Sequence, residues 1–362
     1  MNNIPSVTKI VNTIEENMIN NMISASLSYE PNYRYYWIRD SALVYRCLID
    51  IYSHKYKSKP NVFLETFIIY LENETKIQNL NTLTGLGEPK LNIDYTPFND
   101  SWGRPQNDGP PLRGLNMIKL YEIMKSKKYN SLCDNVILPI IKRDLDYICN
   151  NYEKPSFDLW EEFYGWHFYT RVVQYKFIKE SIKFFKNNNI YHELIEYLID
   201  IQNNLIKDVK DHCDYSIISS FNEEGEIIKK NDASIILAVC HTDFDTDIIN
   251  LVGIDRFIQV SKELVDYFKT KYNNLNVNMI GRYENDKYYQ GHIWILCSLG
   301  LAQFYQYLRI DEEEKKILEY VLNIDDNLIL AEQYDHDNKL QLSAEKLTWN
   351  YSELYFALKK YY

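Results

Sequence analysis

Two acidic segments of the sequence place a carboxylate among aromatic side chains. Residues 158–162 read Asp-Leu-Trp-Glu-Glu, and residues 332–335 read Glu-Gln-Tyr-Asp in a long segment that continues to Trp349. Cleavage of a glycosidic bond by water needs one carboxylic acid that protonates the leaving oxygen and one carboxylate that activates water or attacks the sugar. Each segment is therefore a candidate source of one member of such a pair.

Residues 158–162 also have a simpler explanation. Adjacent acids are favoured at the start of a helix, and for an isolated Trp-Glu-Glu this explanation is the more common one. Two arginines, in Trp-Ile-Arg-Asp at 37–40 and Gly-Arg-Tyr at 281–283, carry forked donors that suit sugar hydroxyls or a carboxylate. Alone, each arginine is better explained by a structural ion pair. The combination of these segments favours a sugar-binding site.

The elements that must position these residues are mainly helical, because apolar residues recur at steps of three and four along much of the chain. The stripes predict helices over 6–27, 40–56, 61–78, 111–127, 132–151, 162–187, 190–211, 233–241, 253–274, 290–309, 312–323 and 347–361. One hairpin is predicted over 214–229. The expected class is all-α with minor β. Twelve helices can pack as six inner and six outer helices, an (α/α)6 double-layered barrel, which periodicity permits without requiring.

Long connections between these helices have an unusual composition. They cover 81–111, 155–161, 276–290 and 327–346, and they are rich in Trp, Tyr, Gly and paired charges. All six tryptophans lie in or beside these connections or the 33–40 stretch. Loops of this length in a compact protein are usually functional or disordered, and their aromatic content argues against disorder.

The whole chain sets further limits. No segment rich in Pro, Gly or Ser divides the 362 residues, so one domain over 1–362 is expected. A net charge of −11 without a Lys/Arg cluster argues against a nucleic-acid partner. No run approaches the roughly 18 apolar residues of a membrane span, and residues 1–27 lack the features of a signal peptide. An intracellular protein with no membrane partner is expected.

Cysteines and acidic clusters suggest no cofactor. The six cysteines are spread through apolar segments, which favours reduced core thiols over disulfides. Residues 241–247 contain alternating acids but lack the Gly and the terminal Glu of a calcium loop, so they are interpreted as a solvated loop or a helix start. We expect no metal.

Taken together, the motifs resemble the fungal-type glucoamylases, glycoside hydrolase family 15. Two matches near the start are Pro-Asn-Tyr-Arg-Tyr-Tyr-Trp-Ile-Arg-Asp at 31–40 and Gly-Leu-Gly-Glu-Pro-Lys at 85–90. The others follow in the order of that family: 101–110 (Ser-Trp-Gly-Arg-Pro-Gln-Asn-Asp-Gly-Pro), 158–162, 281–283, 331–335 (Ala-Glu-Gln-Tyr-Asp), 341–344 (Gln-Leu-Ser-Ala) and 347–349 (Leu-Thr-Trp). The resemblance spans about 30–361.

This resemblance implies a function and a set of roles. Glu161 would be the general acid and Glu332 the general base of an inverting, exo-acting glucan 1,4-α-glucosidase. It would release β-glucose from the non-reducing ends of glycogen, starch or maltooligosaccharides. A monomer without a cofactor is also expected, and because the sequence ends at Tyr362, directly after the last predicted helix, no starch-binding module is expected. The implied substrate-binding or supporting residues are Tyr33, Trp37, Arg39, Asp40, Trp102, Arg104, Leu159, Trp160, Glu162, Arg282, Tyr283, Gln333, Ser343 and Trp349.

Departures from the family pattern leave part of the specificity open. Residues 163–167 read Phe-Tyr-Gly-Trp-His, where the fungal enzymes usually carry smaller polar residues, so the preference beyond the first glucose is not predicted. A non-catalytic carbohydrate-sensing domain is an alternative, which the presence of both carboxylates disfavours. A second alternative is another inverting hydrolase on the same barrel, such as a trehalase, which the motif order disfavours.

Overall fold

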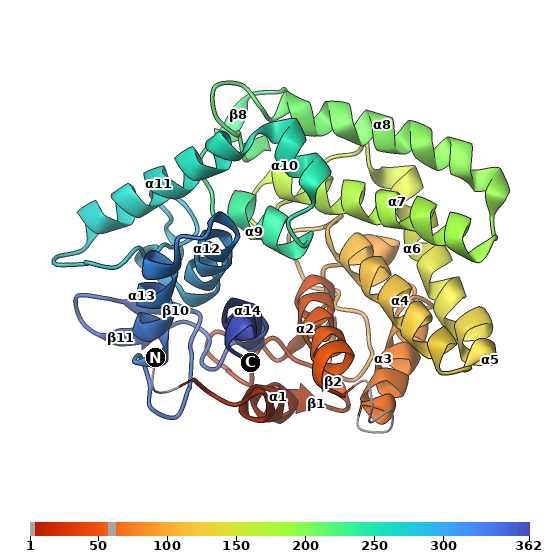
Figure 1. The fold of residues 1–362 in the computed structure, drawn as a ribbon, viewed down its shortest axis with the longest axis horizontal. Coiled ribbons are helices and arrows are strands. Elements are labelled where there is room, and N and C mark those ends of the chain that lie inside the picture. The colour runs from red at the N-terminus through yellow and green to blue at the C-terminus, as the bar shows by residue number, and fades with distance from the viewer. Residues whose placement is uncertain (1–3, 57–62) are drawn as a thin grey trace.

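Six helices that are buried on most sides form a closed ring at the centre of the protein. In the computed structural model, which describes residues 4–56 and 63–362, each helix of the ring contacts the next and the last returns to the first (Figure 1). In chain order they are α2 (Ile38–Ile51), α4 (Gly109–Ser126), α7 (Phe168–Asn188), α9 (Ser234–His241), α12 (Ile295–Leu308) and α14 (Thr348–Leu358). A helix that is apolar all round must avoid water, and every residue of α9 is buried.

A second layer of helices covers this ring. It consists of α1 (Val7–Glu16), α3 (Leu64–Ile77), α6 (Leu138–Asn151), α8 (Ile195–Asp211), α11 (Ile254–Lys271) and α13 (Asp311–Leu322). α1 packs on α14, α6 on α4, α8 on α7, α11 on α9 and α13 on α12. Figure 1 shows α8 and α11 along the outer edge. The outer helices bury only one stripe each, and the predicted (α/α)6 double-layered barrel is confirmed.

The inner helices begin at the same end of the barrel. Strand β3 (Tyr35–Trp37) runs directly into α2, β6 (Tyr164–His167) into α7 and β9 (Ile293–Trp294) into α12. Residues at the starts of α2, α12 and α14 line one cavity at this end. The ring therefore brings together side chains that are far apart in the sequence.

Short strands join the connections at this end into four small sheets among the described residues, where the sequence predicted one hairpin. β1 (Met18–Ile19) pairs with β2 (Met22–Ile23), and β3 pairs with β4 (Lys90–Asn92). The predicted hairpin exists as β7 (Ser220–Phe221) and β8 (Ile227–Lys229). It extends a sheet in the order β5-β6-β7-β8, in which β5 is Ser156–Phe157. The remaining sheet has the order β11-β10-β9, with β10 at Gln333–Asp335 and β11 at Leu340–Leu342.

Three predicted helices were too long because strands lie next to them. The helix expected over 6–27 ends at Glu16, and Asn20 and Asn21, with φ of 50° and 64°, turn the chain between β1 and β2. The helices expected over 162–187 and 290–309 begin only after β6 and β9. Short aromatic runs do not distinguish a strand from the start of a helix. The sequence-based placement of Glu161 at a helix start was therefore wrong.

Other boundaries also moved. The helix expected over 132–151 is divided into α5 (Asn130–Leu132), the π-helical turn η3 (Cys133–Ile137) and α6, and the one expected over 190–211 has α8 only from Ile195. Of the helix predicted over 61–78, residues 61 and 62 lie outside the described residues, and α3 begins at Leu64. Helix α10 (Thr246–Val252) was not predicted, although Asp245 caps it in agreement with the expected helix start near 241–247.

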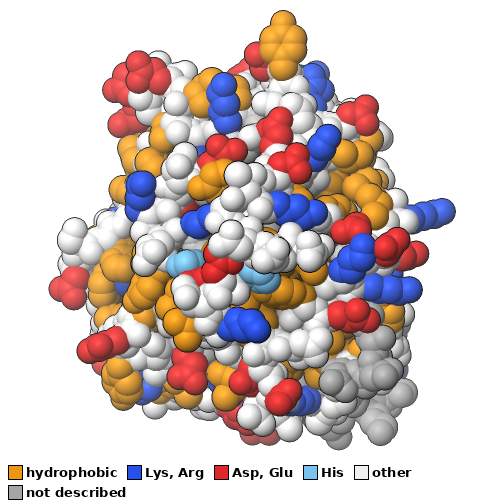
Figure 2. Space-filling view, turned by 90° about the vertical axis from the view of Figure 1, so that its left-hand side faces the viewer, with side chains coloured by type: hydrophobic (Ala, Val, Ile, Leu, Met, Phe, Trp, Pro, Cys, Tyr) orange, Lys and Arg blue, Asp and Glu red, His pale blue; other side chains and the backbone are white. Residues whose placement is uncertain are grey.

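One face of the surface carries charges of both signs, and the six cysteines are free thiols. On the face in Figure 2, acidic and basic side chains are interspersed. Four of the six cysteines are buried and the other two are partly buried, all as free thiols. None of the described helices combines the length and apolarity needed to cross a membrane. Within 4–56 and 63–362, no group of three His, Cys, Asp or Glu side chains has a metal-binding arrangement.

Candidate active site

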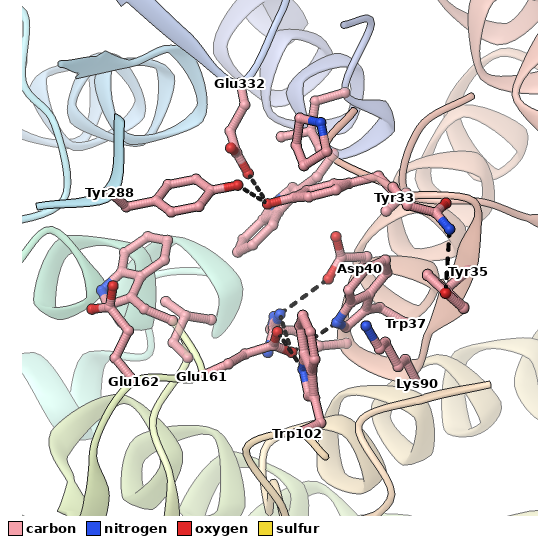
Figure 3. Close-up of a pocket in the computed structure, with 18 of the residues that line it drawn as sticks. Tyr33, Tyr35, Trp37, Asp40, Lys90, Trp102, Glu161, Glu162, Tyr288 and Glu332 are labelled. Carbon is pink, nitrogen blue, oxygen red and sulfur yellow. Dashed lines mark hydrogen bonds and ion pairs between the residues drawn. The ribbon is translucent and has the colours of Figure 1, made fainter. Parts of the chain in front are cut away.

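A cavity of about 650 Å³ lies at the end of the barrel where the inner helices begin, within the size range of small-molecule sites. Most of the residues predicted for the site line it. They are Tyr33, Trp37, Arg39, Asp40, Trp102, Leu159, Trp160, Glu161, Glu162, Arg282, Glu332 and Trp349. Figure 3 shows Glu332 above the centre of the cavity and Glu161 below it. The chain therefore places two carboxylates around one aromatic-walled pocket.

Glu161 lies in a tight turn between β5 and β6. Its backbone has φ of 67°, a left-handed conformation that is uncommon for residues other than glycine. Asp158 holds the turn, because its backbone oxygen accepts from Glu161 N (2.9 Å) and its side chain accepts from Glu162 N (2.8 Å). Lys229 pairs with the same carboxylate at 3.1 Å. These contacts fix the turn from which the Glu161 side chain projects.

The Glu161 carboxylate accepts hydrogen bonds from three side chains. Trp37 Nε1 donates to Oε1 (2.7 Å), Trp102 Nε1 donates to Oε2 (2.7 Å) and Gln106 Nε2 donates to Oε1 (2.9 Å). Arg39 Nη2 lies 3.8 Å from Oε1. These donors orient the carboxylate at the edge of the cavity, as expected of a group that must present a proton in one direction.

Glu332 approaches the cavity from the other side. Tyr33 OH donates to Oε1 at 3.0 Å, and Ser343 Oγ donates to Oε2. Burial raises the pKa of Glu332 to about 7, although the hydrogen bonds from Ser343 and Tyr33 and the charge of Arg282 act to lower it. A buried carboxylate whose pKa lies near neutrality can exchange a proton with a bound water, as general-base chemistry requires.

Ser343 provides a way to test this electrostatic arrangement. Ser343→Ala removes a hydrogen bond to the ionised carboxylate, so the pKa of Glu332 should rise further and less of it should be ionised at neutral pH. We expect kcat/KM at pH 7 to fall about fivefold and the pH–activity profile to move to higher pH. The measurement is kcat/KM on maltose from pH 4 to 9.

A matched control is Ser126→Ala on the exposed end of α4, where the hydroxyl donates to the backbone oxygen of Ile123. This variant should reproduce the wild-type profile. A Ser343→Ala profile that coincides with the wild type would contradict the coupling of this hydroxyl to Glu332.

The polar end of the cavity contains unpaired groups. Asp40 Oδ2 lies 3.3 Å from Arg39 Nη2, yet Asp40 Oδ2, Arg39 Nε and Trp294 Nε1 are buried without a hydrogen-bond partner among the described residues. Burial raises the pKa of Asp40 to about 6, against the opposing charge of Arg39. Buried polar atoms are normally hydrogen-bonded, so unpaired ones beside a cavity are suited to a polar ligand such as a sugar.

A second charged cluster lies across the cavity. Arg282 Nη2 donates to Glu162 Oε1 (2.7 Å), and Arg282 Nε donates to Asp286 (2.8 Å). Tyr283 OH donates to the other oxygen of Glu162. Trp160 Nε1 donates to Asp232 at 2.9 Å, which fixes the ring that lies beneath this cluster. Glu162 and Arg282 are held in a fixed orientation while still lining the cavity.

Four predicted site residues do not line the cavity. Arg104 bonds to Glu88 (2.8 Å) and to backbone oxygens of its own loop, so it supports the segment that carries Trp102. Gln333 accepts from His292 N (3.0 Å) and lies behind Glu332. Ser343 and Tyr283 reach the cavity only through the carboxylates that they contact. These residues position the residues that line the cavity.

The floor of the cavity rests on a buried polar network. Trp349 Nε1 donates to Glu353 Oε1 (2.8 Å), which is also 3.0 Å from His241 Nε2. Gln303 Nε2 donates to the other oxygen of Glu353 at 2.7 Å. The guanidinium of Arg39 lies 5.7 Å from the centre of the Trp349 ring. The network fixes the orientation of the Trp349 ring.

Sequence reasoning missed several residues at the site. Tyr288 OH lies 2.9 Å from Tyr33 OH and 3.2 Å from Ser343 Oγ, and thus completes the set of hydroxyls around Glu332. Gln106, Lys90 and Trp294 contact Glu161 or line the cavity. Tyr288 lies in a connection whose composition was already unusual. Gln106 and Lys90 lie in the matching motifs, but no feature of their residue type indicated a role.

Fold and site together define a class of protein. A double helical barrel with two carboxylates across an aromatic-walled pocket at one end is typical of the helical-barrel glycoside hydrolases. The chain belongs to the glycosyl hydrolases family 15, whose family model matches residues 8–358. The family expected from the sequence is confirmed.

Comparison with individual proteins agrees with this assignment. The chain is 29% identical over 312 residues to Glucoamylase-1 of Arthroderma benhamiae, covering 78% of this chain and 47% of the relative. It is 32% identical over 300 residues to Glucoamylase 1 of Rhizopus oryzae, covering 78% and 49%. The chain thus spans about half the length of the curated relatives that it matches. A third relative, 30% identical over 220 residues (56% of this chain and 39% of the relative), is an intracellular sporulation-specific glucoamylase of Saccharomyces cerevisiae.

Solved structures share the fold. A family 15 glucoamylase from Hypocrea jecorina superposes with a TM-score of 0.87 at 24% identity, covering 97% of this chain and 70% of that one. A glucoamylase from Saccharomycopsis fibuligera superposes with a TM-score of 0.82 at 21% identity, covering 95% and 89%. At these identities the likeness is one of fold.

Proposed function

We propose that this protein is an inverting, exo-acting glucan 1,4-α-glucosidase that releases β-glucose from the non-reducing ends of α-1,4-glucans or maltooligosaccharides. The observation that carries the proposal is the placement of Glu161 and Glu332 across one cavity, each held by its own set of donors (Figure 3). Family membership supports the substrate class. A cavity lined on several sides by aromatic rings suits the terminal sugar of a glucan chain.

The proposed mechanism uses the two carboxylates in different roles. Glu161 donates its proton to the glycosidic oxygen while the bond from that oxygen to C1 breaks. A water bonds to C1 from the opposite face, and Glu332 takes a proton from that water. The products are β-glucose and a glucan shorter by one glucose. Proton exchange with solvent then returns both carboxyl groups to their starting forms.

The remaining residues have proposed binding roles. Asp40, Arg39 and Arg282 would bind hydroxyls of the terminal glucose, since Asp40 and Arg39 present unpaired polar atoms beside the cavity. Trp349 and Tyr33 would pack on the C–H surfaces of the sugar. Glu162 and Leu159 would contact the substrate across the bond to be cleaved. Trp102 lines the cavity, is 40% exposed and donates to Glu161, so its ring is accessible to a sugar beside the acid.

The anomer that forms first tests this proposal. Proton NMR during early hydrolysis of maltotriose should show β-glucose before α-glucose, because water attacks opposite to the departing oxygen. Spectra recorded faster than mutarotation provide the measurement, and a sample of pure α-glucose under the same conditions provides the mutarotation rate. Initial α-glucose would exclude inversion. In a parallel reaction with maltotetraose, release of maltose without glucose would exclude the removal of single glucose units.

Assays on the same purified protein also test the two alternative functions, a carbohydrate-sensing domain and a trehalase. A carbohydrate-sensing domain would bind maltose, detectable by calorimetry, without releasing glucose. A trehalase would hydrolyse trehalose in preference to maltotriose. We expect the purified protein to release glucose from maltotriose and to leave trehalose intact.

Domain organisation, oligomeric state and cellular location are also proposed. We infer that the described barrel acts as one catalytic domain, because α14 closes the ring against α2. We propose a monomer, which light scattering on the purified protein would check. An intracellular site of action is also proposed, with the support of one relative that is named as intracellular. Fractionation of the source cells would test it.

A further inference from the structure

A buried lysine stands directly behind the two tryptophans that hold Glu161. Lys90, the first residue of β4, is opposite Trp37 of β3 in the strand pairing, and only 1% of its surface is exposed. Its Nζ lies 3.1 Å from the centre of the Trp102 ring, 4.3 Å from those of Tyr35 and Phe98, and 4.5 Å from that of Trp37. Lys90 thus occupies an aromatic box (Figure 3).

The aromatic box, formed by Tyr35, Trp37, Phe98 and Trp102, is a closed set of contacting rings. Tyr35 contacts Trp37 (centroids 5.7 Å apart), Trp37 contacts Trp102 (6.3 Å), Trp102 contacts Phe98 (6.0 Å) and Phe98 contacts Tyr35 (5.2 Å). All four pairs are edge-to-face. Tyr35 and Trp37 are alternate residues of β3, so they project from the same side of the strand. This arrangement is built by the fold around the amine.

The ring faces replace the usual partners of a buried amine. Lys90 forms no hydrogen bond or ion pair with any residue in the described part of the chain. Burying an unpaired ammonium is costly, but ring faces attract a cation, and the attraction strengthens where water is excluded. Burial lowers the pKa of Lys90 to about 8, although the charge of Glu161 acts to raise it. The amine is therefore protonated at neutral pH and below.

Two walls of the box are also the hydrogen-bond donors to Glu161. Trp37 Nε1 and Trp102 Nε1 each donate to a different oxygen of this carboxylate at 2.7 Å. A cation against an indole face draws electron density from the ring and makes its N–H a stronger donor, as neighbouring dipoles do in hydrogen-bond chains. The indoles therefore connect a fixed positive charge to the carboxylate.

We propose that Lys90 is a positioning residue for proton donation: its ammonium acts through Trp37 and Trp102 to stabilise the charge that Glu161 acquires when it protonates the leaving oxygen. The inference rests on the proposed function of Glu161 as the acid. Lys90 also lines the cavity, but in this role it acts through the two indoles. Its contribution should appear in the chemical step and should depend on how much the leaving group needs a proton.

Leaving-group dependence separates this role from a structural one. Maltose has a poor leaving group that requires protonation, whereas fluoride leaves α-D-glucopyranosyl fluoride with little help from an acid. Lys90→Met keeps a long apolar stem in the box and removes the charge. We expect kcat on maltose to fall about tenfold or more, KM to change less than about twofold, and kcat on the fluoride to fall less than about threefold.

Two further variants complete the experiment. Lys90→Arg keeps a cation against the rings and should restore most of the maltose activity. Lys76→Met removes a cation that lies 4.9 Å from the Tyr95 ring, away from the cavity, and should behave as wild type on both substrates. In a Trp102→Phe background, which lacks one donor to Glu161, Lys90→Met should cost less than it does in the wild type.

The outcomes separate this proposal from the function on which it rests. A wild-type protein that releases no glucose from maltose overturns the function itself. With an active wild type, equal losses on maltose and on the fluoride, or normal maltose activity in Lys90→Met, overturn the role of Lys90. If Lys90→Met does not fold, Lys90→Gln takes its place. If neither neutral variant folds while Lys90→Arg does, the lysine is structural and the proposal fails.

Discussion

Glu161→Gln is expected to lower kcat on maltotriose by about a thousandfold while leaving the fold intact. The amide keeps the size of the side chain and its single oxygen can still accept from Trp37 or from Trp102, but it has no acidic proton to give to the glycosidic oxygen. KM should change little, because the sugar-binding groups are untouched. Initial rates of glucose release, with circular dichroism to verify folding, provide the measurement.

The role of an acid predicts a second result for this variant. Fluoride needs little protonation, so α-D-glucopyranosyl fluoride should lose far less than maltotriose in Glu161→Gln. Glu153→Gln, on the surface near the same loop, is a matched control that should retain full activity on both. Near-normal maltotriose hydrolysis by Glu161→Gln would refute the assignment of this residue.

Glu332→Gln should change activity and stability in opposite directions. Loss of the base should lower kcat by about two to four orders of magnitude on every substrate, fluoride included, because each reaction needs an activated water. The folded protein should nevertheless become more stable. Burial raises the pKa of Glu332 to about 7, above the model-peptide value of 4.5, so its ionisation destabilises the folded state as pH rises through this interval.

The size of this stabilisation follows from the same shift. A rise of the pKa from 4.5 to about 7 corresponds to about 3 kcal/mol at pH 7, and the glutamine can keep an acceptor for Tyr33. We expect Tm to rise by about 2–5 °C at pH 7 and above, and the difference to disappear below pH 4.5. Thermal melts across pH provide the measurement, and an unchanged or lower Tm at pH 7 would contradict it.

Glu353→Gln is a comparison of opposite sign. Desolvation opposes the charge of this buried carboxylate, but His241, Arg46 and Gln303 outweigh it and lower the pKa of Glu353. Its ionisation therefore stabilises the folded state above the unfolded pKa, and the glutamine should lower Tm at pH 7. Opposite changes of Tm in the two variants would distinguish Glu332, which lines the cavity, from Glu353, which supports the structure.

Much of the site was predictable because its chemistry depends on residue type and order along the chain. Twelve of the sixteen predicted site residues line the cavity, since Trp, Arg and Glu occur together in segments that the fold brings to one end. Arg104 and Gln333 only support residues that line the cavity, but the sequence-based prediction placed them in the same group as the lining residues. No pattern in a single sequence separates the two groups, because the difference lies in the direction of the side chain.

What the sequence could not supply was local backbone geometry. The sequence predicted Glu161 at the start of a helix, yet it adopts a left-handed conformation in a turn that Asp158 holds by hydrogen bonds. The box around Lys90 depends on the pairing of β3 with β4, whose residues are some fifty positions apart in the chain. Helical periodicity carries no information about such pairings, because strands of two or three residues are too short to have a pattern. The helices were therefore predicted better than the turns that carry the chemistry.

The shared orientation of the inner helices has an electrostatic consequence. Each helix start carries roughly half a positive charge from its aligned peptide dipoles, and the starts of α2, α12 and α14 border the cavity. This fixed positive field offsets part of the negative charge of Asp40, Glu161 and Glu332, in addition to the contribution of nearby cationic side chains. At the helix ends the field has the opposite sign, and there Arg46 donates to the Cys240 oxygen near the end of α9. The barrel is polarised along its axis, which favours an acidic pocket at the end where the inner helices begin.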